Sequence, residues 1–139
     1  MYQLTTEHSF DSAHFLAGYQ GKCGNLHGHR WRVVLTVEAE ELQTDRQRDG
    51  MCVDFAELKE DLRRLLDSFD HLLIIEQDSL RPETRQALKA EGFPVVEMPF
   101  RPTAENFAKY FYDRFTEMHY RVAQVQVFET PNNCATYRE

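Results

Sequence analysis

Hydrophobic and polar residues alternate along two stretches near the start of the chain, a pattern typical of strands with one buried face. The first stretch covers residues 2–10 and the second residues 31–39. We expect these strands to pair antiparallel across a glycine-containing loop, residues 15–26. A third alternating stretch at residues 122–129, then a turn and a last strand that ends at Tyr137, close the chain. The pattern therefore predicts two strands at each end of the protein.

Apolar side chains at three- and four-residue steps predict two amphipathic helices between these pairs of strands. The first begins after Asp54, a typical N-cap residue, and ends near Asp70. The second begins after Thr103 and carries an aromatic stripe that we interpret as core packing. Residues 79–92 favour a short additional helix and residues 93–100 an extended segment. The order strand, strand, helix, helix, strand, strand predicts an α+β fold in which two helices cover one face of an antiparallel sheet.

Composition narrows the class of protein. A chain of 139 residues with 42% hydrophobic residues predicts one domain over residues 1–139. The formal net charge of -7 argues against a nucleic-acid partner, because phosphate contacts normally need a basic face. No apolar run approaches the roughly 20 residues of a membrane span, and the start lacks the features of a signal peptide. We therefore expect a cytoplasmic protein that acts on a small molecule and contacts no membrane.

The segment KCGNLHGHR, residues 22–30, brings one cysteine and two histidines close together. If His27 and His29 begin the second strand, their side chains leave the same face, because strand side chains alternate with period 2. His14, near the end of the first strand, then lies opposite them across the hairpin. Three neutral imidazoles suit zinc and leave a fourth position for water or substrate.

Cys23 has two interpretations that the residues alone leave open. It can be a fourth ligand that closes a structural Cys-His₃ zinc site, or it can stand beside the metal as a thiolate acid or base. A zinc hydratase or hydrolase with a His₃-water site would need no cysteine. The other two cysteines, Cys52 and Cys134, lack such neighbours and are interpreted as small hydrophobic residues.

Six segments carry a resemblance to a known family. In order along the chain they are FDSAHFL, CGNLHGH, MCVDFAELK, FDHLLI, PTAENFAKYFYD and VFETPNNCATY. On these motifs the chain resembles the 6-pyruvoyltetrahydropterin synthase and 6-carboxytetrahydropterin synthase family, from about Phe10 to Tyr137. The resemblance implies the tunnelling fold, ββααββ, whose subunits assemble into a barrel-forming homotrimer, usually stacked in pairs as a homohexamer.

The resemblance also implies roles for individual residues. It assigns the zinc ligands to three histidines: His14, His27 and His29. It assigns the catalytic thiol to Cys23 and a proton relay with that thiol to Asp70 and His71, which the residues alone would describe as a structural pair at a helix end. Glu129 matches the family's pterin anchor. Thr103 and Glu105 match a segment near the pterin pocket, although a helix start explains both equally well.

Two reactions of the family start from 7,8-dihydroneopterin triphosphate. One eliminates triphosphate and gives 6-pyruvoyltetrahydropterin. The other also breaks a carbon–carbon bond and gives 6-carboxy-5,6,7,8-tetrahydropterin, acetaldehyde and triphosphate, on the path to 7-deazaguanines such as queuosine. Only three residues separate Cys23 from His27, a spacing that resembles the carboxy-forming members. We therefore expect the carboxy-forming reaction, with the pyruvoyl-forming reaction and a non-catalytic module with a closed Cys-His₃ zinc as alternatives.

Overall fold

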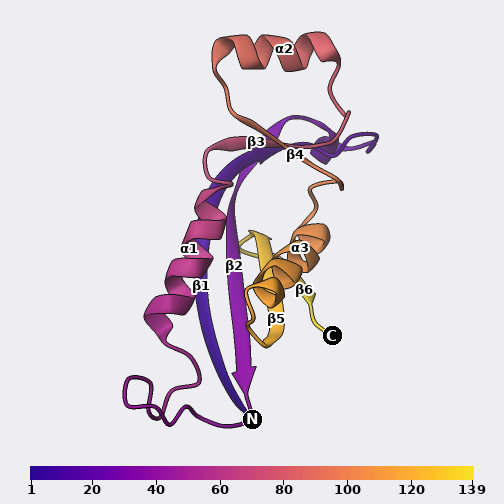
Figure 1. Ribbon diagram of the computed structural model, residues 1–139. Coiled ribbons are helices and arrows are strands. Elements are labelled where there is room, and N and C mark those ends of the chain that lie inside the picture. The colour runs from indigo at the N-terminus through magenta and orange to yellow at the C-terminus, as the bar shows by residue number, and fades with distance from the viewer.

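Two long strands form the spine of the protein. The computed structural model describes residues 1–139 and shows β1 (Tyr2–His14) and β2 (His27–Ala39) side by side as a tall antiparallel pair (Figure 1). The two strands pair along their whole length. Their register places His14 directly opposite His27, so the hairpin itself brings these two imidazoles together. The prediction of an antiparallel pair is confirmed.

Four further strands extend the sheet to six, in the order β4-β3-β1-β2-β5-β6. The predicted C-terminal hairpin consists of β5 (Val122–Thr130) and β6 (Asn133–Tyr137), which pair antiparallel. On the other side, β3 (Leu72–Glu76) runs parallel to β1, and β4 (Val95–Met98) runs parallel to β3. The sheet is therefore mixed rather than purely antiparallel, because a helical crossover between β3 and β4 returns the chain in the same direction.

Two helices cover one face of this sheet, as predicted (Figure 1). They are α1 (Phe55–Asp67) and α3 (Ala104–Glu117). Local chemistry sets where each begins: the Asp54 side chain accepts a hydrogen bond from the Ala56 N–H, and the Thr103 hydroxyl accepts one from the Asn106 N–H. No helix combines the length and apolar character that a membrane span requires.

The additional helix α2 (Pro82–Glu91) stands away from the rest of the chain, at the top of Figure 1. It has no buried side chain and ends at Gly92, whose left-handed φ of 82° caps the last turn. A short turn of 3-10 helix, η1 (Lys22–Gly24), interrupts the loop between β1 and β2. Both segments contribute little to the core.

The core lies between the sheet and the two covering helices. Phe10 and Trp31 face each other across β1 and β2, and the aromatic stripe of α3 packs onto them through Phe107 and Phe111. All four side chains are buried, in agreement with the interpretation of that stripe as core. His14 is also fully buried, with its ring 4.9 Å from that of Trp31. One side of the histidine cluster is therefore held by the hydrophobic core.

Candidate metal centre

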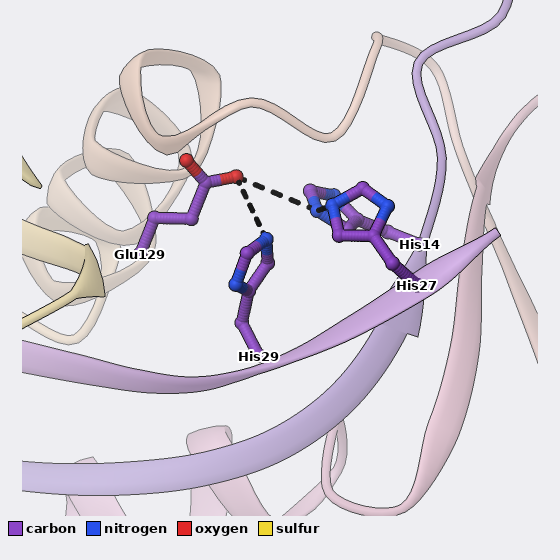
Figure 2. A group of neighbouring side chains, drawn as sticks. All are labelled: His14, His27, His29 and Glu129. Atoms are coloured by element: carbon purple, nitrogen blue, oxygen red, sulfur yellow. Dashed lines mark hydrogen bonds and ion pairs between the residues drawn. The ribbon is translucent and has the colours of Figure 1, made fainter. Parts of the chain in front are cut away.

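Three imidazoles and one carboxylate converge at the end of the β1–β2 ladder that adjoins the connecting loop (Figure 2). The ring centroids lie 4.6 Å apart for His14 and His27, 4.7 Å for His27 and His29, and 5.0 Å for His14 and His29. The end of β1 supplies the first histidine and the start of β2 the other two. The structure thus brings together the three histidines that the sequence singled out.

Backbone carbonyls decide which way two of the imidazoles point. His14 Nδ1 lies 2.9 Å from the carbonyl oxygen of Pro102, and His27 Nδ1 lies 2.6 Å from that of Asn25. A carbonyl oxygen only accepts hydrogen bonds, so each Nδ1 carries the proton and each Nε2 keeps a lone pair. Carbonyl partners of this kind orient metal-binding histidines in many proteins.

The Nε2 atoms, which face the centre of the cluster, have no hydrogen-bond donor among them. The Nε2 atoms of His14 and His27 face each other at 3.1 Å, and two neutral lone pairs at that distance repel unless a cation lies between them. His29 Nε2 is buried and has no hydrogen-bond partner. A metal ion bound by all three Nε2 atoms would remove the repulsion between His14 and His27 and would give His29 Nε2 a partner. The donor set therefore fits a zinc ion.

Glu129, near the end of β5, completes the cluster. Its Oε1 atom lies 3.4 Å from Nε2 of both His14 and His29 (Figure 2). One ligand atom from each of the four residues lies within 4.8 Å of the others. The sequence predicted a pterin-binding role for Glu129 and did not include it among the ligand candidates. Its proximity depends on the pairing of β5 with β2, a contact between distant parts of the chain that the sequence pattern does not specify.

Burial favours the neutral form of two of the imidazoles. It lowers the pKa of His14 to about 4; the hydrogen bond to the Pro102 carbonyl acts in the opposite direction, and His27 and His29 add smaller lowering contributions. Burial also lowers the pKa of His29, although the nearby Glu129 carboxylate acts in the opposite direction. Neutral imidazole is the form that binds metal.

Cys23 lies outside this cluster. It is half-buried in η1, and its sulfur is absent from the group of ligand atoms around the three histidines. Its loop is held by a hydrogen bond from Leu16 N–H to the Cys23 carbonyl, at 2.8 Å, and by Arg101, which donates to the Ala17 carbonyl at 2.7 Å. The structure therefore does not include Cys23 among the clustered ligand atoms.

Asp70 and His71 form a hydrogen-bonded pair in the turn between α1 and β3. The Asp70 carboxylate accepts from His71 Nδ1 and from the Asp11 N–H, both at 2.8 Å. The Asp11 N–H, followed by the smaller influence of His71, lowers the pKa of Asp70. His71 has a left-handed φ of 58°, uncommon for a residue with a side chain. His71 lines an open groove together with His29, one of the three clustered histidines.

Thr103 and Glu105 do not join the cluster. Thr103 is the N-cap of α3, and Glu105 is exposed in the first turn of that helix, where a negative charge is favourable. The contact of this segment with the site is made instead by Pro102, through its carbonyl and His14. The sequence offered no signal for a backbone carbonyl in that role.

The fold and the histidine cluster define a known class of protein. Residues 3–139 match the sequence profile of the family described as 6-pyruvoyl tetrahydropterin synthase, and the chain belongs to this family. The chain is 32% identical to the 6-carboxy-5,6,7,8-tetrahydropterin synthase of Haemophilus influenzae, with 100% of both chains covered. It is 35% identical to the protein of the same name from Rickettsia bellii, over 95% of this chain and 96% of the relative.

Solved structures share the fold. The 6-pyruvoyl tetrahydropterin synthase of Plasmodium falciparum superposes with a TM-score of 0.71 at 21% identity, over 99% of this chain and 97% of the other. The expected fold class is therefore confirmed, including the curled sheet with helices on one face.

Proposed function

We propose that this protein is a zinc-dependent enzyme that converts 7,8-dihydroneopterin triphosphate to 6-carboxy-5,6,7,8-tetrahydropterin, acetaldehyde and triphosphate. The observation that carries the proposal is the set of three imidazoles whose Nε2 atoms converge without a donor between them. Relatives named for the carboxy product, at 32–35% identity, support this reaction over the pyruvoyl-forming alternative. The reaction would serve 7-deazaguanine and queuosine biosynthesis in the cytoplasm.

The three histidines would hold the zinc ion, and the backbone carbonyls of Pro102 and Asn25 would keep two of them correctly oriented. When bound, zinc supplies a Lewis acid that polarises substrate oxygens and stabilises negative charge on them. The hydrophobic core behind His14 excludes water from one side of the centre. Glu129, whose Oε1 atom lies 3.4 Å from two of these imidazoles, would act at the metal and would also anchor the pterin, as the family resemblance implies.

Proton transfer would fall to the groups around this centre. The Asp70 carboxylate accepts a hydrogen bond from Nδ1–H of His71. His71 Nε2 would then be free to exchange a proton with the substrate. Cys23, which is half-buried and is not one of the clustered ligand residues, would act as the second acid or base, as the family resemblance implies. Thr103 and Glu105 would lie toward the pterin, as the family resemblance implies.

The decisive experiment incubates the zinc-loaded protein with 7,8-dihydroneopterin triphosphate, identifies the pterin by mass, and assays acetaldehyde. Equal amounts of carboxytetrahydropterin and acetaldehyde are expected. His27→Ala and His29→Ala should lose most zinc and all product, whereas Glu83→Gln on the distant α2 should behave as wild type. A pyruvoyl product without acetaldehyde would favour the first alternative, and a zinc-loaded protein without turnover would favour a structural zinc site.

Assembly belongs to the same proposal. The single chain leaves two edges of the sheet without a neighbour, along β4 and β6. Exposed edges of this kind are usually paired or protected, because unpaired N–H and C=O groups attract other strands. We propose that copies of the chain form a homotrimer, or a homohexamer made from two trimers.

A further inference from the structure

A groove opens where the ladder between β2 and β5 stops. The last paired residues are Arg32 and Phe128, so residues 27–31 of β2 pair only with β1. The resulting groove has a volume of about 390 Å³. His29 and Glu129 lie along it, and Arg30, Arg32 and Phe128 are also among its lining residues. The groove therefore leads from the candidate metal centre to a pair of arginines.

The two arginines share one face of β2. They occupy alternate positions of the strand, which places their Cα atoms about 6.6 Å apart, on the face of β2 opposite to the buried Trp31. The Arg32 guanidinium lies 3.8 Å from the centre of the Phe128 ring, which restricts its position. A stacked arginine and the second arginine two positions away therefore form a pair of cations in the lining of the groove.

Most of the hydrogen-bonding capacity of these guanidinium groups is unused. Arg30 donates one bond to Asp11 at 3.2 Å, and Arg32 donates one bond to Glu7 at 2.8 Å. A guanidinium has five N–H donors in a planar fork that matches phosphate oxygens. The Arg30 side chain is 73% exposed, so its fork is open to a ligand. Exposed ion pairs such as these two contribute little stability and are readily exchanged for a stronger anion.

Small residues keep the approach to the arginines open. Across the hairpin, Ser9 stands opposite Arg32, and Asp11, the ion-pair partner of Arg30, stands opposite Arg30. The next pair on the same face, toward the loop, consists of Ala13 and Gly28, so no large side chain follows Asp11 in that direction. In a protein of net charge -7, a polyanionic ligand needs such a local cationic site to offset general repulsion.

We propose that Arg30 and Arg32 bind the triphosphate end of the substrate while its pterin end lies at the metal centre. This inference rests on the proposed function and assigns the subsite that the reaction needs for its leaving group. The arginines form charge-assisted hydrogen bonds with phosphate oxygens, and Glu7 and Asp11 yield their bonds when the ligand enters.

The test measures the preference for the phosphorylated ligand. In a Cys23→Ala background that prevents turnover, zinc-loaded protein is titrated with 7,8-dihydroneopterin triphosphate and with unphosphorylated 7,8-dihydroneopterin. Arg30→Gln and Arg32→Gln should each weaken binding of the triphosphate by roughly 10-fold, and the double variant by roughly 100-fold. Binding of the unphosphorylated ligand should not change. The preference should also fall as the salt concentration rises.

Two further variants separate a lost subsite from a damaged fold. Arg32→Lys keeps the charge opposite Glu7 but loses the planar fork, so an intermediate loss of preference is expected. Arg85→Gln removes a comparable arginine, paired with Glu97 at 3.5 Å and far from the groove, and should leave the preference unchanged. A preference that survives in the double variant, while wild-type protein still forms product, would overturn this inference alone. Wild-type protein that forms no product would overturn the proposed function and this inference with it.

Discussion

At the scale of single residues, His14 shows how the core prepares a metal ligand. Its ring is fully buried, its Nδ1 is fixed by the Pro102 carbonyl, and burial lowers its pKa to about 4. The imidazole is therefore neutral and held in one orientation, with Nε2 directed toward the other histidines, before a metal ion binds. Cys23 and Glu129 act at the same scale, and single substitutions can separate their roles.

Cys23→Ala should keep its zinc and its fold but lose roughly 10²–10⁴-fold in turnover, the usual contribution of a positioned acid or base. The reason is that its sulfur stands outside the cluster of ligand atoms. Zinc content and single-turnover product formation should be measured on the same preparation, with Cys134→Ala, an exposed cysteine, as the control. Loss of zinc together with unfolding would show that Cys23 is a structural ligand.

Glu129→Gln should weaken zinc binding by about 10–100-fold, the effect typical of partners that support metal ligands, because its carboxylate lies 3.4 Å from two imidazoles. It should also weaken binding of a pterin product by about 1–3 kcal/mol, the scale of hydrogen bonds to a charged group. Competition with a zinc chelator and calorimetry measure the two effects. Wild-type values in both assays would remove Glu129 from the site.

At the scale of elements, the loop between β1 and β2, which carries Cys23, is tightly packed at its backbone. A Cβ atom added at Gly24 would lie 2.4 Å from the Tyr19 carbonyl oxygen, well inside the contact limit. The Tyr19 carbonyl belongs to the backbone, so it cannot move away from an added Cβ as easily as the end of a flexible side chain could. The conformation of this loop therefore depends on glycine at this position.

Gly24→Ala should destabilise the protein by about 1–3 kcal/mol, as overpacking typically does, and should speed hydrogen exchange in residues 15–26. Gly28→Ala is the matched control, because its added Cβ would meet the Ser12 carbonyl oxygen at an ordinary 3.5 Å. Chemical denaturation compares the two. Equal stabilities would show that the loop adapts to a side chain.

Asp70 joins the end of α1 to β1 through the Asp11 N–H, and this link should depend on pH. Because its pKa is lowered in the folded state, its stabilising contribution is present at neutral pH and declines as the pH falls through the ordinary aspartate range toward the lowered pKa. Asp70→Ala should therefore cost about 1 kcal/mol at pH 7 and much less near pH 3. A cost that is the same at both pH values would contradict this origin.

At the scale of the whole molecule, the helix-free face and the two open sheet edges point to assembly. Copies that pair along β4 and β6 would cover both edges and enclose the helix-free face, on which Arg30 and Arg32 lie. Two grooves are lined both by Arg30 on that face and by His29 of the metal centre. Assembly would therefore place the sites close to neighbouring subunits.

Sedimentation of the zinc-loaded protein at micromolar concentration should show a trimer or hexamer with a mass three or six times 16.4 kDa. The expectation follows from edge strands that lack partners in the single chain. Dilution into the nanomolar range should lower turnover per subunit if sites lie between subunits. A monomer at all concentrations with full activity would contradict both statements.

The sequence by itself determined the features that arise from neighbouring residues. Period-2 alternation specified β1, β2 and β5, and side-chain caps at Asp54 and Thr103 set the starts of α1 and α3. A hairpin is a local structure, so the meeting of His14 with His27 was also predictable. These features need only interactions between residues close in sequence or across one turn.

Only the tertiary structure decided how distant segments meet. It placed β3 and β4 parallel to β1, brought Glu129 into the histidine cluster, supplied the Pro102 carbonyl to His14, and opened the groove beside Arg32 where the β2–β5 ladder ends. Each of these depends on the register between elements separated by dozens of residues. That register is set by the packing of the whole core, in which alternative pairings differ in buried area and steric fit.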